Sequence, residues 1–329
     1  MFITVLIPTY GNCGRLRDAL AAVCGQRCEP GSFEVIVIGH AGAEEKAFDT
    51  VMEASRQYGS AALRYFCVDQ VDKHYAVNRG IIEAKGEVIA LIDDDIIVGN
   101  DWIRNIIDAF SSYPAECAGG RIDIRWINGD PPGWIRYFTK YFGEINLGPR
   151  ARKLTRGETV NAGNLMIRRA AIMAAGGYPP CNHRVSTVIG NGEVDLCNTL
   201  HRGRTDIYWL PGVSAEHIQD ASLVNADTLR NKAVLNGKAR AYTVFRAAQG
   251  RPVSILRHFA AASARCLLNS IRLLFTSDAG EKYPYYFRHH YHSGFISHLY
   301  AIASSKHLRK QVRIDDWISE IHRDTAGGD

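Results

Sequence analysis

Three adjacent carboxylates, Asp93, Asp94 and Asp95, follow the apolar run Val88–Ile92 directly. This short run is rich in β-branched residues and has the length of a buried strand, so the acids fall at the carboxyl end of that strand. Adjacent like charges repel one another, and a divalent cation is the simplest partner that makes the cluster favourable. The triplet therefore indicates a site for a hard cation. Asp clusters also build turns and cap helices, so the triplet alone leaves this structural explanation equally open.

The direction of each carboxylate follows from the conformation expected there. Side chains alternate along an extended chain, which would turn Asp93 and Asp95 to one face and Asp94 to the other. One face would then offer two oxygen ligands in an Asp-x-Asp pattern.

The preceding residues predict the elements that position these acids. Strand-like runs cover Phe2–Ile7, Phe33–Ile38 and Leu63–Val68, and helical patterns follow the first and third of them at about 15–23 and 74–84. Alternating strands and helices predict an α/β fold whose mostly parallel sheet is flanked by helices and connected by right-handed crossovers. Open sheets of this kind bind ligands beyond the carboxyl ends of their strands, which is where the three acids are expected.

Five short motifs give the chain a family resemblance. They are Val5–Tyr10, Asn78–Ile81 with Ala84–Glu87, Asp93–Asp95, Gly176–Tyr178, and Glu193–Leu196. Each is weak alone, but their order and approximate spacing resemble those of the family 2 glycosyltransferases, which have the GT-A fold. The resemblance covers residues 1–218 and implies a nucleotide-sugar half at 1–98 and an acceptor half at 99–218. Residues 219–329 are then expected to form a mainly helical C-terminal region.

The resemblance also implies an activity. Enzymes of this family transfer a sugar, with inversion, from a nucleotide-sugar donor to a hydroxyl group, here of a glycan or a lipid-linked acceptor. A divalent metal, Mn²⁺ or Mg²⁺, bridges the donor diphosphate to the Asp-x-Asp motif, and such a cation neutralises the leaving group. The positions implied at the donor are Pro8, Thr9, Tyr10, Asn78, Arg79, Asp93 and Asp94, and those at the acceptor are Gly163 and Asn164.

Metal ligands and a general base can be assigned on the same resemblance. Asp93 and Asp95 are the expected metal ligands, and His217 is a candidate third ligand, because neutral imidazole binds Mn²⁺. A lone His is also often structural. Glu193 is the expected base, since a carboxylate within reach of the acceptor hydroxyl can take its proton. Asp195 is the alternative, although an acid in the first turn of a helix is favoured by the helix dipole alone.

Two departures from the family pattern affect donor binding. The second strand ends in Gly39–Gly42 without the usual acid for the nucleobase, so His40, the backbone of Thr9 and Tyr10, or Asp69 or Asp72 would have to replace it. Val77 stands where relatives carry an Arg that contacts the diphosphate, and Arg79 or Lys73 could compensate. These departures motivate the alternative of a glycosyltransferase-like binding or scaffold protein without turnover. A dehydrogenase is disfavoured because no Gly-x-Gly-x-x-Gly follows the first strand.

The segment 126–158 joins the two halves and is rich in aromatic residues. Trp134, Phe138, Tyr141 and Phe142 have helical spacing, which is more typical of a packed core than of a sugar platform. Trp134 is nevertheless the residue of this set that we assign to acceptor binding.

Composition and charge set the expected environment. The chain has 329 residues and eight cysteines without Cys-x-x-Cys pairs, and Met1–Thr4 runs into the first strand without a basic leader, so a cytoplasmic protein is expected. Residues 225–329 contain 16 Lys and Arg against 8 Asp and Glu. A helical appendage packed on the rest of the chain is the explanation that we favour for this region. The alternative, which the charge excess and the Arg-interrupted apolar run near 258–275 suggest, is peripheral contact with an anionic membrane at the inner face of the plasma membrane. No nucleic-acid partner is expected, because no binding motif accompanies the charge.

Overall fold

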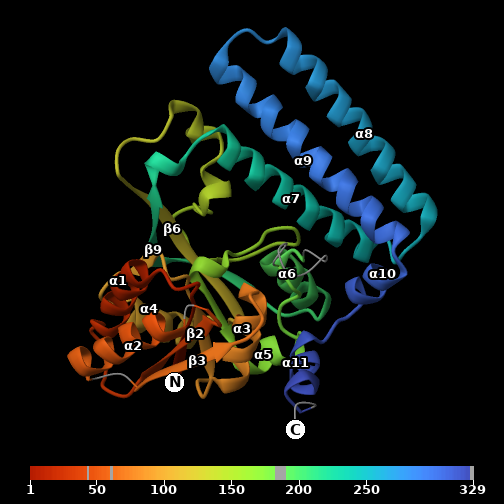
Figure 1. The fold of residues 1–329 in the computed structure, drawn as a ribbon. Helices are drawn as coiled ribbons and strands as arrows, with labels where there is room; N and C mark the ends of the chain where they lie inside the picture. Colours follow the sequence, from red (N-terminus) through yellow and green to blue (C-terminus); the bar gives the residue numbers. More distant parts are fainter. Residues whose placement is uncertain (43, 60–61, 182–189, 327–329) are drawn as a thin grey trace.

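The computed structural model describes residues 1–42, 44–59, 62–181 and 190–326. Within them one mixed sheet carries helices on both faces, and a group of long helices extends from one side of it (Figure 1). The strands are β1 (Ile3–Pro8), β2 (Phe33–His40), β3 (Ala62–Val68), β4 (Val88–Leu91), β5 (Ile96–Val98), β6 (Cys117–Ile127), β7 (Arg152–Lys153), β8 (Leu165–Arg168) and β9 (Ile207–Asp220).

The helices alternate with the strands in the first part of the chain and follow one another after β9. They are α1 (Cys13–Cys24), α2 (Glu44–Tyr58), α3 (Lys73–Glu83), α4 (Trp102–Ser112), α5 (Arg169–Ala174), α6 (Gly192–Arg202), α7 (Ala226–Ala247), α8 (Pro252–Phe275), α9 (Ala279–Ser304), α10 (Lys306–Val312) and α11 (Trp317–Ala326). Short 3₁₀ helices are η1 (Gly133–Tyr137), η2 (Thr139–Phe142), η3 (Ala162–Asn164) and η4 (Ala221–Leu223).

The sheet has the order β3-β2-β1-β4-β8-β6-β9-β5, and β7 pairs with β9. The strands from β3 to β4 are parallel, β8 is antiparallel to both of its neighbours, and β6 and β9 are again parallel to each other. β1 and β2 are buried along their whole length because helices cover both faces, which explains their continuous apolar runs. The expected α/β class and all four predicted strands of the first half are confirmed.

Two hydrophobic cores lie on opposite faces of the sheet. Helices α1, α2 and α4 cover one core, and α3, α5, α6 and α11 cover the other. Val77, which stands in place of the family's usual Arg, is 1% exposed and belongs to the second core. The side chain at this position therefore packs against the sheet and cannot contact a diphosphate.

The chain turns immediately after β4, and this corrects one expectation. The backbone N–H of Ile96 donates to the carbonyl of Asp93, at 3.1 Å, and closes a turn over the three acids before β5 begins. Strand alternation therefore does not apply to Asp93, Asp94 and Asp95. Their carboxylates have three different sets of partners instead of two faces.

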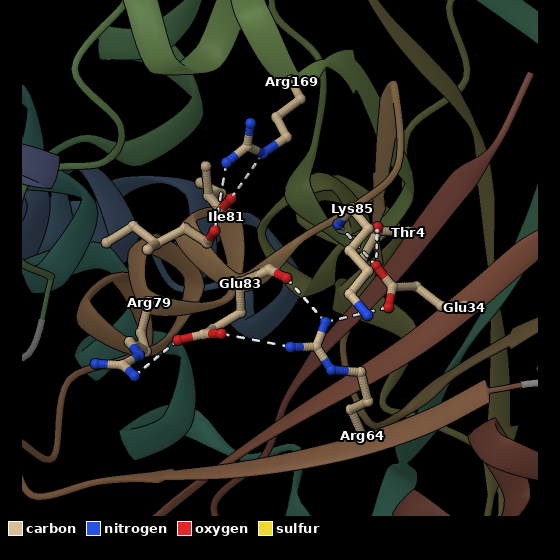
Figure 2. A network of polar contacts seen from close by, with 9 residues as sticks. Thr4, Glu34, Arg64, Arg79, Ile81, Glu83, Lys85 and Arg169 are labelled. Atoms are coloured by element: carbon tan, nitrogen blue, oxygen red, sulfur yellow. Dashed lines mark hydrogen bonds and ion pairs between the residues drawn. The ribbon is translucent and has the colours of Figure 1, made fainter.

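A polar network lies at the amino ends of the parallel strands, on the side of the sheet opposite to the three acids (Figure 2). Glu34 is 1% exposed and accepts from the Thr4 hydroxyl and the Lys85 backbone, while Arg64 contacts both Glu34 and Glu83. Because buried charges are stable only when they are paired, these contacts explain the polar residues at the strand starts.

A glycine completes this edge at the turn between α3 and β4. A Cβ at Gly86 would lie 2.4 Å from the backbone nitrogen of Thr4, so only glycine fits. The motif Ala84–Glu87 therefore serves the packing of this turn against β1.

The C-terminal helices form one group, and the last of them returns to the sheet. Helix α7 packs on α9, and α8 packs on α9 from the outside, so that α8 is the outermost helix of the group (Figure 1). The chain then returns, and α11 packs against α3 (Figure 1). The backbone N–H of Trp317 donates to the carbonyl of Gly176 at 2.9 Å, and Ile318 joins the second core. The C-terminal region is thus tied into the fold at its far end.

Asn164 links three parts of the acceptor half. It is fully buried, accepts from the Trp102 indole at 3.0 Å, and donates to the carbonyls of Val213 at 2.7 Å and Arg121 at 3.2 Å. Because both amide hydrogens and the oxygen are used within the fold, the side chain is not available to an acceptor. The acceptor contact expected at Asn164 stays a prediction, and the side chain has a structural role.

We expect Asn164→Ala to lower the free energy of unfolding by about 2–4 kcal/mol, because it leaves buried partners without hydrogen bonds. Chemical denaturation followed by circular dichroism measures this. Asn105→Ala is the matched control: it removes the single exposed amide contact to the Gly212 carbonyl and should cost less than about 1 kcal/mol. Equal losses in the two variants would contradict the role assigned to Asn164.

Candidate active site

Asp94 is held by the loop that follows β1. Thr9 is 1% exposed, and its hydroxyl donates to the Asp94 carboxylate at 2.5 Å. Burial, with added repulsion from Asp95 and Asp93, raises the pKa of Asp94 to about 6, although the Thr9 hydrogen bond opposes this. Pro8 ends β1 one residue before this contact and pairs with Ile38 of β2. The Pro8-Thr9 segment thus positions one acid of the triplet.

Asp95 faces a different group of side chains. Arg15 of α1 lies 3.1 Å from Asp95 Oδ2, and His217 Nε2 of β9 lies 3.2 Å from Asp95 Oδ1. Burial would raise the pKa of Asp95, but the His217 hydrogen bond and the charges of His217 and Arg15 outweigh it and lower that pKa. Gln219 also contacts His217 Nε2, at 2.7 Å. Asp95 and His217, far apart in sequence, therefore form one pair.

Asp93 turns to Lys73, the first residue of α3, whose ammonium nitrogen lies 2.6 Å from Asp93 Oδ1. Burial alone would lower the pKa of Lys73, but the carboxylates of Asp93 and Glu193 outweigh it and raise that pKa. Glu193 lies in the first turn of α6 and accepts from the backbone N–H of Ala162 at 3.3 Å. Lys73 therefore connects the acid triplet electrostatically to the predicted base.

The expected metal ligands are brought together in part. Among the described residues, no group of three or more His, Cys, Asp and Glu side chains is arranged to hold a metal ion. Asp95 Oδ1 and His217 Nε2 lie side by side and fit a divalent cation as two protein ligands. Mg²⁺ often binds through one or two carboxylates together with substrate phosphates, and such a partial protein site suits that mode. Asp93 is instead directed to Lys73.

Two residues expected at the donor are committed elsewhere. Asn78 is 2% exposed, donates to the Tyr178 carbonyl and accepts from the Tyr178 backbone N–H, both at 2.8 Å. Arg79 pairs with Glu83 at 2.7 Å, within the network at the starting edge of the strands (Figure 2). Both side chains thus have partners within the fold, and the donor contacts expected of Asn78 and Arg79 stay a prediction. Lys73, the alternative to Arg79, is the cation that lies beside the acids.

Tyr10 and His40 form a ring stack at the end of β2, where the acid expected to bind the nucleobase is missing. Tyr10 stacks on His40, with ring centroids 4.5 Å apart, and Tyr10 is 52% exposed while His40 is 2% exposed. His40 Nδ1 lies 2.8 Å from the Gln70 carbonyl, and burial lowers the pKa of His40, which favours a neutral ring that donates to that carbonyl. Asp72 is buried and caps α3, accepting from the backbone of His74 and Tyr75, so its carboxylate is engaged there.

Asp195 and Glu193 have different surroundings although they share the first turn of α6. Asp195 is 7% exposed, lies 3.7 Å from the Arg246 guanidinium of α7, and has its pKa raised by burial. Gly192, which replaces the first acid of the family motif, has no room for a side chain, since a Cβ there would lie 2.8 Å from the His74 ring. Asp195 therefore packs between α6 and α7, whereas Glu193 accepts from Ala162 and contributes to the raised pKa of Lys73.

The acceptor-side residues are partly structural. Trp134 stacks on Tyr283 of α9 with ring centroids 4.4 Å apart, and Phe138 and Phe142 are buried in the same cluster. The aromatic segment therefore joins the acceptor half to the C-terminal helices. Gly163 is buried in η3, beside the Ala162 backbone that contacts Glu193.

Some site residues could not have been selected from the sequence. Arg15, Gln219 and Lys232 were not expected, because no motif contains them. Lys232 of α7 lies over the Phe142 ring at 4.5 Å, and burial lowers its pKa while the Asp95 carboxylate opposes this. Arg15 comes from α1, Gln219 from β9 and Lys232 from α7, so tertiary contacts bring these groups near the triplet.

A sequence profile described as "Glycosyl transferase family 2" matches residues 4–174, more than half of the chain. The chain belongs to this family. The match includes β1, α3, the acid triplet and β8, while α6 with Glu193 lies beyond it.

Curated relatives cover similar parts of the chain. Glycosyltransferase AglE of Haloferax volcanii is 26% identical over 188 residues, which are 56% of this chain and 58% of the relative. The glucosyl-dolichyl phosphate glucuronosyltransferase of the same organism is 24% identical over 184 residues, 54% of this chain and 56% of that protein. The chain thus matches these relatives over less than two thirds of their length.

Solved structures agree in fold. The mannosyltransferase PcManGT of Pyrobaculum calidifontis, in complex with GDP-Man and Mn²⁺, has a TM-score of 0.54 at 12% identity, covering 98% of this chain and 86% of that one. The S. aureus TarS fragment 1–349 with UDP-GlcNAc has a TM-score of 0.51 at 14% identity, covering 92% of each chain. These similarities confirm the GT-A fold class expected from the motifs.

We expect Asp195→Asn to leave the turnover number of the enzyme within about threefold, because Asp195 contacts α7 and not Lys73. Its effect on the free energy of unfolding should stay below about 2 kcal/mol, since Arg246 keeps Asp315 and the Val312 carbonyl as partners. Steady-state kinetics and denaturation measure both. A loss of more than about a hundredfold in turnover would assign the general base to Asp195.

Proposed function

We propose that the protein is an inverting glycosyltransferase that moves a sugar from a nucleotide-sugar donor to an acceptor hydroxyl, with a divalent metal at the donor. The observation that carries the proposal is the position of Lys73. Its ammonium group lies against Asp93, and the Glu193 carboxylate contributes to its raised pKa. The expected donor acids and the expected base thus lie around one cation at the carboxyl ends of the strands. Family membership and the fold of nucleotide-sugar-bound neighbours support the same activity.

The donor is proposed to lie across the ends of β1 and β4. The Tyr10 ring is largely exposed and held from behind by His40, which makes it a stacking surface for a nucleobase in place of the missing acid. Pro8 and Thr9 would line the path, and Thr9 keeps Asp94 in position. Lys73 and Arg15 supply positive charge near the donor phosphates.

Mn²⁺ or Mg²⁺ is proposed at Asp95 and His217, with Asp93 as a further ligand once the donor phosphates compete for Lys73. When bound, the ion neutralises the charge that develops on the leaving diphosphate. Two of the neighbouring structures contain Mn²⁺. Arg15 would then move from Asp95 toward the phosphates, since a guanidinium binds phosphate bidentately.

Glu193 is proposed as the general base. Its carboxylate takes the proton of the acceptor hydroxyl as the oxygen attacks the anomeric carbon, and the bond between that carbon and the diphosphate breaks, with the electron pair leaving on the phosphate oxygen. The Glu193 carboxylate contributes to the raised pKa of Lys73, which keeps a cation between the acids and the proposed base. A single displacement from the opposite face inverts the configuration.

The acceptor is proposed to be a glycan or a lipid-linked molecule that enters beside Gly163, with Trp134 nearby in the aromatic segment. A lipid-linked acceptor is favoured by the relative named for glucosyl-dolichyl phosphate. The described residues contain no helix long and apolar enough to cross a membrane. On the basic excess of residues 225–329, we propose a cytoplasmic protein that meets such an acceptor at the inner surface of the plasma membrane.

We expect Glu193→Gln to lower the turnover number by about 10²–10⁴-fold, the usual value of positioned proton transfer. The nucleotide affinity should change less than about threefold, because the base does not hold the donor. Sugar transfer from a panel of nucleotide sugars and calorimetry with UDP or GDP measure the two effects. Absence of transfer by the native protein with every donor would favour the binding or scaffold alternative, whereas native turnover of the variant would remove Glu193 from the mechanism.

We expect donor affinity to fall at least tenfold in excess chelator and in Asp95→Asn, because each removes part of the metal bridge to the diphosphate. Calorimetric titration of UDP and GDP with and without Mn²⁺ measures this. Asp123→Asn is the matched control, since Asp123 is paired with Arg121 on the exposed face of β6. In the same titrations Tyr10→Ala should weaken nucleotide binding with or without metal. Undiminished affinity without metal would contradict the metal bridge.

A further inference from the structure

Most of the large apolar side chains of α8 lie on the side of the helix that faces away from the rest of the protein. Of its 24 residues only Ala262 and Asn269 are buried. The side turned to α7 and α9 is mixed: Ile255, Phe259 and Ala262 pack on the core of these helices. Further along, polar groups take that side, where the hydroxyl of Ser270 lies 2.9 Å from His289 Nδ1 and the thiol of Cys266 lies 3.5 Å from the same atom. An ordinary surface helix buries its apolar side, so α8 needs an apolar partner outside the described fold.

An apolar stripe runs along the outer side of α8 for its full length. Its large members are 43–84% exposed and fall within one face at the helical period of 3.6 residues. They are Val253, Leu256, Leu267, Leu268, Ile271, Leu274 and Phe275. A helix of this length extends about 36 Å. The large residues lie in two groups, Val253 with Leu256 and 267–275, and the exposed Ala260 and Ala264 lie between them on the same face.

Two pockets line one flank of this stripe. One, of about 730 Å³, lies between α7, α8 and α9, and the other, of about 650 Å³, lies between η1, η2, α8 and α9. They share Arg265, Tyr291 and His292, and no carboxylate lines either of them. Their further cations are Lys140, Arg240, Arg251, Arg257, Arg272 and Arg288.

The charge on this flank is not neutralised within the fold. Helix α8 contains no Asp or Glu, and in the part of the chain that the structure describes Arg257, Arg265, Arg272 and Arg288 form no ion pair. Burial lowers the pKa of His292, and the charges of Arg265 and Arg288 lower it further, which agrees with a positive environment. The pockets therefore suit anionic groups such as phosphates.

We propose that α8 lies in the surface of an anionic phospholipid bilayer, with its apolar stripe below the headgroups and its flanking pockets holding lipid phosphates. An apolar face beside a basic flank is the arrangement of interfacial helices. A second copy of the chain fits less well, because pairing two α8 helices would bring their uncompensated arginines together. This deepens the proposed function, on which it rests only in placing the active site near a lipid-linked acceptor.

Co-sedimentation of the full chain with phosphatidylcholine vesicles, with and without phosphatidylglycerol, tests the proposal. We expect binding to the anionic vesicles that weakens as salt rises. Leu267→Glu and Leu274→Glu should each weaken vesicle binding at least tenfold, because each puts a charge where the proposal places an apolar side chain below the headgroups. Leu223→Glu is the matched control at a similarly exposed leucine of η4 and should bind like the native protein.

The pockets are tested by the double variant Arg265→Gln/Arg288→Gln, which should also lose at least tenfold in binding, and by inorganic phosphate, which should displace the protein more than chloride does at equal ionic strength. Glu193→Gln should bind vesicles normally, so failure of the catalytic proposal is distinguishable. Thermal unfolding verifies that each variant is folded.

Three results would overturn the proposal. One is equal binding to neutral and anionic vesicles, or no binding at low salt. Another is phosphate competition that persists while the leucine variants bind vesicles normally, which would mean that the pockets take soluble phosphate. The third is a native dimer, detected by light scattering, that Leu267→Glu dissociates, which would make a second copy the partner of the stripe.

Discussion

Compensation of the Asp93–Asp95 charges is the constraint on which the site depends. Three carboxylates in one turn are unfavourable unless each finds a partner, and the fold supplies a different one to each. Thr9 comes from the end of β1, Lys73 from the start of α3, and Arg15 with His217 from α1 and β9. Four elements therefore have to be in place before the turn is stable, which couples the folding of both halves to the formation of the site.

The two edges of the sheet show a division of roles. At the starting edge of the parallel strands, Glu34, Arg64 and Glu83 are paired with one another, and the charges are satisfied within the fold. At the carboxyl edge, Lys73 and Arg15 are paired with Asp93 and Asp95. In the proposed complex a metal would replace these cations at the acids, and the donor diphosphate would pair with the cations. Such exchange needs no new charge in the protein. The same residue types thus stabilise one edge and remain exchangeable at the other.

The C-terminal helices extend this site and are not an independent appendage. Lys232 of α7 and the aromatic residues around Trp134 join the helices to the acceptor half, and α11 returns to pack on α3. Helix α8 exposes most of its large apolar side chains, beside the flank where the arginines lack acids. The proposed membrane contact is thereby connected to the acceptor half through α9 and the aromatic segment.

The sequence by itself determined the class of the protein, because β-branched runs, helical periodicity and five ordered motifs are local signals. It placed the strands of the first half, the acids at the end of β4, and Lys73 as one of two candidate cations. Tertiary structure decided the rest. A turn at Asp93–Ile96 overrode strand alternation, and contacts with residues distant in the sequence committed Asn78 and Asn164 to the fold. No local pattern could show this, since which partner a polar side chain takes depends on residues up to a hundred positions away.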